Sequence, residues 1–342
     1  MAWLSGWQYR KKLTIDKTKV DADLTDFPVL VKLTSSNFNF SRARSDGYDI
    51  RFTSSDGTTL LKYERERHDS SNQVAEYHVK IPFVSSSSNT DFYIYYGNPS
   101  ASDGADPTNV WDSNFKGVWH LKDYTTSQVN DSTINANNGT KTASNEPLEV
   151  DAKIGKGQQF DGINDMINCG SNSVLMPQAI TLSLWFKPNY IGTPTKGLLH
   201  ICPDDGSAGA AIMYDSDVAG IIKFFVKLGG SWYNASSTIY MSVGNWYHIV
   251  CTFGDGYQKL YINGSINVSI SRSGTINYGT SPYCKIGRGN STEWSYGVID
   301  EVSISNVVRS AAWIKASYNS GNDTLLSYGS EELPSPFLLF FN

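Results

Sequence analysis

Paired carboxylates are the first chemistry to examine, because hydrolysis of a glycosidic bond needs two acidic side chains that flank it. Glu64 and Glu66 alternate along one stretch, but the residues between and around them are mostly basic. That mixture is typical of a solvated, charged strand. Asp215 and Asp217 occur where a strand-like run gives way to a loop. Neither pair predicts an active site, and a hydrolase is therefore a minority interpretation.

Nucleophilic catalysis has even less support in the sequence. None of the histidines accompanies a G-x-S-x-G motif or a similar nucleophile setting. We expect His248, inside a strand-like run, to pack or hydrogen-bond rather than to abstract protons. The five histidines are His68, His78, His120, His200 and His248.

The four cysteines do not predict a zinc site, because no two of them have the CxxC spacing that such sites use. They are Cys169, Cys202, Cys251 and Cys284. Cys251 lies on an apolar face and is expected to be a small core residue. The sequence leaves open a disulfide between any two cysteines and requires none.

The stretch that indicates the fold most clearly is Gly244–Ile266, GNWYHIVCTFGDGYQKLYINGSI. Apolar residues alternate with a period of two, and Asp-Gly and Asn-Gly turns bound the second run. This pattern predicts a β-hairpin. Of its two faces, the one with Tyr247, Ile249, Cys251 and Phe253 is the more apolar, so we expect it to face the core.

The composition favours an all-β fold with two β-sandwich domains. In 342 residues, aromatics reach 13% and charged residues only 18%, while Ser, Thr, Asn and Gly are abundant. One short helix is expected, over 309–314, with Asn306 or Ser310 near its start. A net charge of −5 without a basic stripe makes nucleic acid an unexpected partner. No window predicts a membrane span.

Residues 1–110 read as a small all-β unit that ends in a turn-rich boundary at Asn98–Pro107. The order W-x-Y-R-K-K-L-T-I, D-I-R-F-T-x-x-D-G and Y-I-Y-Y-G-N-P resembles an uncharacterised domain family over about residues 1–100. Such domains often precede laminin G-like (LamG) modules in microbial and viral surface proteins. The family has no established chemistry that this resemblance would carry over.

The rest of the chain is similar to the LamG and pentraxin-like, concanavalin A-type jelly rolls over about residues 118–320. The hairpin carries this resemblance, with an F-D-G-x-x-D turn at 160–165, ITLSLWFKP at 180–188 and GVIDEVSI at 297–304. We therefore expect a jelly-roll domain at 111–331, after a first domain at 1–110 and before a tail at 332–342.

This resemblance implies a calcium ion, which binds carboxylate and carbonyl oxygens. Asp300 is the first candidate ligand, and Asp131 is a companion from a polar loop. Asp161, Asp165 and Glu301 also lie where related modules sometimes hold calcium. The alternative is that these aspartates cap turns or accept hydrogen bonds from backbone amides.

Four aromatic residues are candidates for sugar binding. Trp232 and Tyr233 lie in G-G-S-W-Y-N, and Trp294 and Tyr296 lie in N-S-T-E-W-S-Y. An aromatic ring stacks on the C–H face of a sugar while neighbouring polar groups bind its hydroxyls. For each aromatic residue taken alone, packing at the edge of the sandwich is the simpler role.

The C-terminal tail differs in kind, because two prolines precede five consecutive large apolar residues. The tail either packs on its own domain or docks on a larger assembly as an anchor. The anchor residues would be Phe337, Leu338, Leu339, Phe340 and Phe341.

Together these features predict a non-enzymatic surface protein. The first residues, MAWLSGWQYRKKLTI, do not predict a secretory signal peptide, and virions assembled in the host cytoplasm need none. We therefore expect a phage capsid decoration, head-fibre or tail-fibre protein at the virion surface. It would present a lectin-like domain for adhesion to glycans or host surfaces, and a homo-oligomer is plausible. The alternatives are a secreted or cell-surface carbohydrate-binding module and, less favoured, a glycoside hydrolase.

Overall fold

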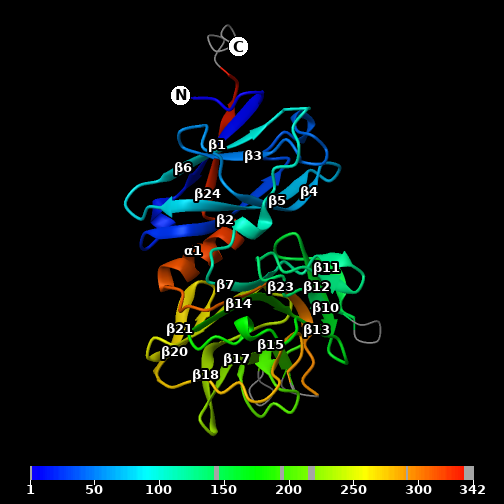
Figure 1. Cartoon of the computed structure of the whole chain (residues 1–342), viewed down its shortest axis with the longest axis vertical. Helices are drawn as coiled ribbons and strands as arrows, with labels where there is room; N and C mark the ends of the chain where they lie inside the picture. Colours follow the sequence, from blue (N-terminus) through cyan, green and yellow to red (C-terminus); the bar gives the residue numbers. More distant parts are fainter. Residues whose placement is uncertain (1, 142–145, 193–195, 215–219, 290–291, 335–342) are drawn as a thin grey trace. The chain divides into compact units, whose positions relative to one another are not determined.

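A computed structural model of the chain describes residues 2–141, 146–192, 196–214, 220–289 and 292–334. Regular structure in these residues is almost entirely β-strand, which confirms the expected all-β class; they contain one α-helix, α1 (Ala311–Gly321). The chain divides into two compact units (Figure 1). Unit 1 comprises Met1–Asp112 and Lys315–Asn342, and unit 2 comprises Ser113–Ile314.

Unit 1 contains two antiparallel sheets. The order of the four-stranded sheet is β24 (Leu326–Glu332), β1 (Tyr9–Ile15), β6 (Thr90–Tyr96) and β3 (Arg51–Ser54). The order of the three-stranded sheet is β2 (Leu24–Thr34), β5 (Val74–Val84) and β4 (Tyr63–Asp69). Strand β5 illustrates the packing, because its alternating residues Ala75, Tyr77 and Val79 are all fully buried.

The C-terminal part of unit 1 differs from our expectation, which placed residues 315–331 in the second domain. Strand β24 pairs with β1, with Leu326 opposite Ile15 and Glu332 opposite Arg10. The two ends of the described chain therefore lie side by side in one sheet, as the blue and red strands of Figure 1 show. Unit 2 is consequently an insertion between β6 and β24. Pairing with β24 gives β1 a second neighbour, besides β6, for its backbone hydrogen bonds.

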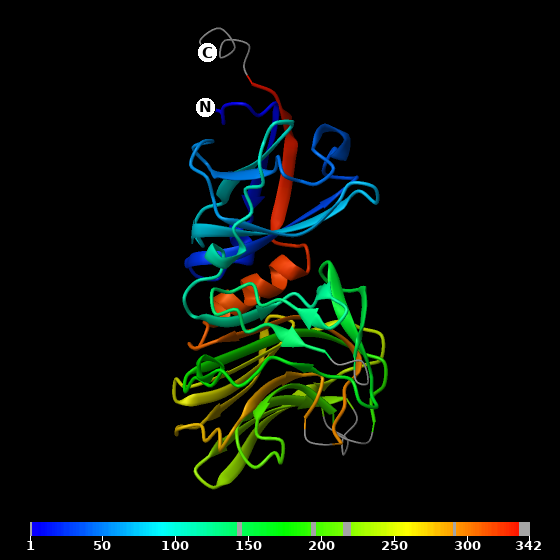
Figure 2. The same ribbon diagram turned by 45° about the vertical axis from the view of Figure 1, so that its right-hand side comes forward.

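Unit 2 is a sandwich of two larger sheets, visible as two layers in Figure 2. The nine-stranded sheet has the order β18 (Ser231–Tyr240), β17 (Ile221–Leu228), β16 (Ala210–Tyr214), β15 (Lys196–Cys202), β22 (Tyr283–Ile286), β13 (Ile167–Asn168), β10 (Gly139–Thr140), β9 (Gln128–Val129), β8 (Asp123–Thr125). The eight-stranded sheet has the order β11 (Leu148–Asp151), β12 (Lys156–Asp161), β23 (Tyr296–Ser305), β14 (Ile180–Pro188), β19 (Tyr247–Phe253), β20 (Tyr257–Ile262), β21 (Ser265–Ser271), and β7 (Phe115–Trp119) also pairs with β23.

The predicted hairpin is confirmed as β19 and β20, with Phe253 opposite Gln258. Ile249, Cys251 and Phe253 belong to the core between the two sheets, and Tyr247 packs against that core, as expected. The turn after β20 uses Asn263 at φ 50° and Gly264 at φ 77°. Two consecutive residues at positive φ are what a type I′ hairpin turn requires, and Asn-Gly supplies them at low cost.

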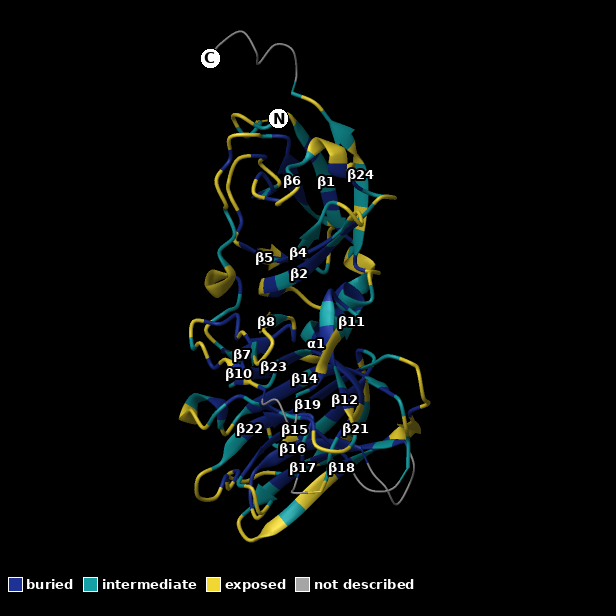
Figure 3. Cartoon of the chain, turned by 90° about the vertical axis from the view of Figure 1, so that its right-hand side faces the viewer, coloured by how far each residue is buried: buried dark blue, intermediate teal, exposed yellow. Residues whose placement is uncertain are grey.

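Figure 3 shows the inner strands of unit 2 as mostly buried, whereas most residues of β18, at the edge of its sheet, are exposed or half-buried. The helix expected over 309–314 is confirmed, but it begins at Ala311 and continues to Gly321. The Ser310 hydroxyl accepts a hydrogen bond from the amide of Trp313 at 3.1 Å and so caps its start. Short 3-10 helices within the described ranges occur at Lys17–Lys19, Phe40–Arg42, Pro107–Asn109 and Ser173–Leu175.

Candidate functional site

Two tyrosines form an exposed aromatic surface at one end of the unit 2 sandwich. Tyr296 is the first residue of β23, and Tyr190 follows the end of β14 by two residues. Their strands are paired there, with Pro188 opposite Gly297, and the amide of Asn189 donates to the Tyr296 carbonyl at 3.1 Å. The rings stack with centroids 6.5 Å apart, and the residues remain 45% and 38% exposed. We call Tyr190 and Tyr296 the tyrosine platform.

The F-D-G-x-x-D turn lies directly beside this platform. Asp161, at the end of β12, is opposite Tyr296 in the sheet. The Asp165 carboxylate accepts a hydrogen bond from the Asp161 amide at 2.7 Å, and burial raises the pKa of Asp165. Gly162 has φ +80°, and a Cβ there would lie 3.0 Å from the Cβ of Tyr296. Glycine therefore lets the turn pass close to the platform.

Trp294 lies two residues before Tyr296, in the segment that leads into β23. The Arg288 guanidinium lies over its ring at 4.6 Å, and the two residues form an isolated β-bridge. Asp204 is 3.9 Å from the same guanidinium and also pairs with Lys285. Trp294 is thus partly covered by a cation, while Tyr296 is more open.

The four predicted aromatic residues do not form one site. Trp232 and Tyr233 are consecutive in β18, so their side chains leave opposite faces of the sheet. Trp232 packs edge-on against Phe225 at 6.2 Å, with the Lys227 ammonium 5.5 Å from its ring. Tyr233 lies under the Arg272 guanidinium at 4.6 Å. Of the four residues, Tyr296 is the one that belongs to the tyrosine platform, and its partner Tyr190 is a residue that the sequence analysis missed.

The two predicted calcium ligands are buried and engaged by backbone donors. Asp131 accepts hydrogen bonds from the amides of Val118, Thr133 and Asn137 at 2.8–3.0 Å. Asp300 accepts from the amide of Ile154 and from that of its own neighbour, Glu301, both at 2.8 Å. Among the described residues, neither aspartate belongs to a group of three or more metal-ligating side chains. Both aspartates therefore have the role that the alternative interpretation gave them, as acceptors of hydrogen bonds from backbone amides.

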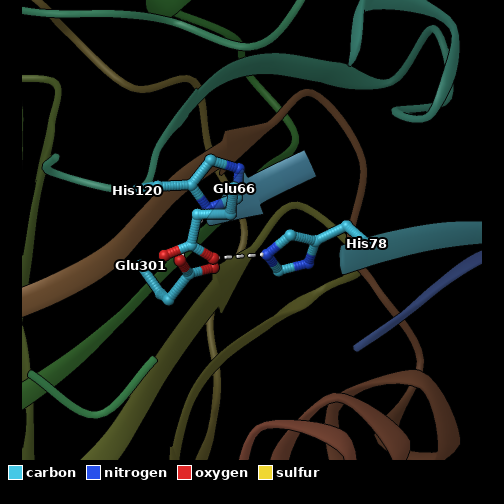
Figure 4. Close-up of side chains that lie close together, drawn as sticks. All are labelled: Glu66, His78, His120 and Glu301. Carbon is cyan, nitrogen blue, oxygen red and sulfur yellow. Dashed lines mark hydrogen bonds and ion pairs between the residues drawn. The ribbon is translucent and has the colours of Figure 1, made fainter. Parts of the chain in front are cut away.

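In unit 1, Glu66 and His78 form a buried pair that the sequence did not predict. His78 Nε2 is 3.0 Å from a Glu66 carboxylate oxygen (Figure 4). The indole of Trp111 lies 5.4 Å from the His78 ring and donates to Glu64 at 2.9 Å. Both glutamates are buried, so the expectation of a solvated strand was wrong. Both carboxylates have partners on neighbouring segments, which offsets the cost of burying them.

A similar pair occurs within unit 2. His120 Nδ1 and a Glu301 carboxylate oxygen are 2.6 Å apart; both side chains are drawn in Figure 4. Glu301 adopts φ +52°, a strained conformation for a residue with a Cβ. The two residues are 181 positions apart, so no local sequence pattern predicts that they pair.

Two other histidines of unit 2 are also buried. His248 contacts the Ser183 hydroxyl at 3.1 Å and the Trp185 ring at 4.9 Å, which confirms its predicted packing role. Burial lowers the pKa of His248 to about 3. Burial, aided by the nearby Lys285 and Arg288 cations, also lowers the pKa of His200 to about 3. Both imidazoles are neutral near pH 7 and poor proton acceptors there.

The predicted anchor Phe337–Phe341 lies outside the described residues. Before it, Leu333 follows the edge strand β24 and is exposed. No helix in the described ranges is long and apolar enough to cross a membrane.

Family comparisons bear on both units. Residues 160–315 match the model of the concanavalin A-like lectin/glucanases superfamily, of the laminin G type. Residues 46–166 match a domain of unknown function (DUF2341). This second match extends beyond the division at Asp112 and includes β7 to β12 of unit 2. No curated protein has significant similarity to the chain.

Solved structures share the fold. Domain 4 of AbnA, a GH43 extracellular arabinanase from Geobacillus stearothermophilus, in complex with arabinotriose, is 21% identical with a TM-score of 0.50. That match covers 62% of this chain and 98% of the arabinanase domain. The binding domain of Paraclostridial Mosquitocidal Protein 1 is 18% identical with a TM-score of 0.50, and the match covers 60% of this chain and 52% of that domain. The chain therefore spans about half of the toxin domain. At these identities the likeness concerns the fold, which hosts many functions.

The chain thus carries a concanavalin A-like domain of the laminin G type at 160–315, preceded by a domain of the DUF2341 family at 46–166.

Proposed function

We propose that this chain is a non-enzymatic adhesion protein whose unit 2 binds a glycan on the tyrosine platform. The observation that carries the proposal is the stacked, half-exposed pair Tyr190 and Tyr296 at the end of the sandwich. Two ring faces suit the C–H faces of a sugar chain, and the exposed Asp161 beside them offers a carboxylate for hydroxyl groups. Strand pairing and the bond from the Asn189 amide to the Tyr296 carbonyl hold the two residues side by side, which limits the ordering needed on binding.

Two buried histidines of unit 2 do not offer a general base for catalysis. His200 and His248 have pKa values of about 3, so neither is poised to exchange protons near neutral pH. A glycoside hydrolase, the least favoured alternative, predicts release of reducing ends from mixed polysaccharides, and a reducing-sugar assay tests that directly.

The binding proposal is tested on a glycan array, with arabinotriose as an additional soluble probe. We expect the wild-type chain to bind at least one glycan and the Tyr296→Ala and Tyr190→Ala variants to lose that signal. Tyr257→Ala is the matched control, because Tyr257 is also exposed but lies beyond the opposite end of β14. The nine residues of β14 separate the two places by about 30 Å. Equal binding by all three variants would refute the proposal that the glycan binds on the tyrosine platform.

The same glycan array is also measured in the presence of calcium and in the presence of a chelator. Since Asp131 and Asp300 already accept backbone hydrogen bonds, we expect the array signal to be the same in calcium and in a chelator. Loss of binding in the chelator would show a calcium site formed by other ligands.

We further propose that the protein is displayed on a virus particle, as a capsid decoration, head-fibre or tail-fibre protein. Support comes from the resemblance of residues 1–100 to domains of microbial and viral surface proteins and from the apolar run near the C-terminus. The partner would be a capsid or tail, with a homo-oligomer as the form displayed. The alternative, a secreted or cell-surface carbohydrate-binding module, predicts recovery from the medium or the cell wall instead.

The anchor is tested by ending the chain at residue 334, after β24. We expect this variant to fold and bind glycans like the wild type but not to co-sediment with purified particles, because it lacks the apolar residues Phe337–Phe341. Replacing Phe337, Phe340 and Phe341 by serine should have the same effect at full length. Normal incorporation of both variants, or failure of both to fold, would refute a docking role.

A further inference from the structure

Cys284 lies on β22, and Cys169 directly follows the last residue of β13, the neighbouring strand in the nine-stranded sheet. Strands β13 and β22 are antiparallel, with Asn168 opposite Lys285. One position further, the Cys169 amide donates to the Cys284 carbonyl, and the Cys284 amide donates to the Gly170 carbonyl, both at 2.8 Å. Cα atoms of facing residues in antiparallel strands are about 4.5–5.5 Å apart. Disulfides span Cα distances of about 4.4–6.8 Å, so the backbone places these cysteines within bridging range.

The side chains also point the same way. Both residues belong to the core between the two sheets of unit 2, where Cys169 is 3% and Cys284 is 0% exposed. Burial raises the pKa of the Cys169 thiol well above its usual value, and a side-chain hydrogen bond with the Cys284 thiol raises it further. The thiols are therefore in contact, and both are free.

The other two cysteines are not placed to form a disulfide with Cys169 or Cys284. Cys202 is opposite Tyr283 in the same sheet, but it packs with Ala211 and Met213 in a separate cluster. Cys251 is on β19 of the eight-stranded sheet, opposite Leu182 and Leu260. Of the four cysteines, the pairing of the strands therefore brings Cys169 and Cys284 together.

We propose that Cys169 and Cys284 are a reversible redox pair that closes into a cross-strand disulfide under oxidising conditions. The oxidant is a small disulfide such as oxidised glutathione. One protein thiolate attacks it and expels a first glutathione thiolate, and the second protein thiolate then displaces the other. A new Sγ–Sγ bond forms, the glutathione disulfide is reduced to two thiols, and the two cysteine protons end on those thiols.

The bridge would join two parts of the chain that are 115 positions apart (284 − 169). Closing so long a loop restricts the unfolded chain and therefore stabilises the fold. It would fasten β13 directly to β22 in the middle of the nine-stranded sheet. Such a device suits a protein that folds where thiols stay reduced and works where they become oxidised.

The test uses the full chain, incubated for days at pH 8 with oxidised glutathione, because burial keeps the Cys169 thiol protonated and slows exchange. We expect a mass loss of about 2 Da and a linked peptide containing Cys169 and Cys284. The melting temperature should rise by about 5–10 °C and return on reduction. Cys251→Ala should retain this rise, whereas Cys284→Ala and Cys169→Ala should lose it.

The peptide map of the wild-type chain decides the proposal even if a cysteine variant fails to fold. It is overturned if no Cys169–Cys284 peptide forms under conditions in which the unfolded chain reacts with glutathione. It is equally overturned if Cys202 is found as the partner of either residue.

Discussion

At the scale of single residues, Asp131 shows how one buried carboxylate organises a loop. It accepts hydrogen bonds from the amides of Val118, Thr133 and Asn137. Asp131→Ala would leave these buried donors without their acceptor, and we expect a loss of about 3 kcal/mol in the free energy of unfolding. Urea denaturation measures it, with Asp205→Ala as the exposed control, expected to change stability by less than about 0.5 kcal/mol. Equal effects of the two substitutions would contradict the assignment.

The buried histidines of unit 2 predict a pH dependence of stability. His200 and His248 have folded-state pKa values of about 3, below the ordinary value of about 6.5. Below pH 6.5 the unfolded chain therefore binds a proton at each site that the folded chain does not. Stability is fully present above that pH and falls on acidification by about 1.4 kcal/mol per pH unit for each histidine.

Denaturation of the full chain at pH 7, 6 and 5 checks this prediction. Replacing His248 by glutamine should remove about half of the slope that the two histidines contribute, because the variant side chain does not titrate in this range. A slope that is unchanged in the variant would show that other groups cause the acid sensitivity.

At the scale of elements, β24 is the strand on which unit 1 depends most clearly. Ending the chain at residue 323 would remove β24 and the buried Leu325, together with the Tyr328 hydroxyl that donates to the Lys32 carbonyl at 2.8 Å. We expect limited proteolysis to cut residues 1–112 rapidly, while residues 113–314 stay protected. The control ends at residue 334 and keeps β24. Protection of residues 1–112 in the shorter chain would show that β24 is dispensable.

The sequence predicted the hairpin elements well and β24 poorly, for a physical reason. Alternation and turn residues are local, so β19 and β20 could be recognised within Gly244–Ile266. The pairing of β24 with β1 joins residues more than 300 positions apart and depends on the unsatisfied backbone edge of β1. No pattern in LSYGSEE distinguishes that partner from a strand of the second sandwich.

The candidate site shows the same limit at the scale of the whole molecule. Tyr296 was predicted from its aromatic, polar surroundings, but its partner Tyr190 is 106 positions away (296 − 190) and meets it through the pairing of β14 with β23. Trp232 and Tyr233 looked equivalent in sequence, yet strand alternation sends them to opposite faces of the sheet. The sequence could therefore identify aromatic candidates, but only the pairing of the strands shows which of them lie together.

The central claim is that unit 2 binds a glycan on the tyrosine platform, and calorimetric titration with the best glycan from the array tests it most directly. The wild-type chain and Tyr257→Ala should bind with the same affinity. The double variant Tyr190→Ala/Tyr296→Ala should bind at least about 10-fold more weakly, equivalent to about 1.4 kcal/mol. Unchanged affinity in a folded double variant would contradict the claim and place the glycan elsewhere on the protein.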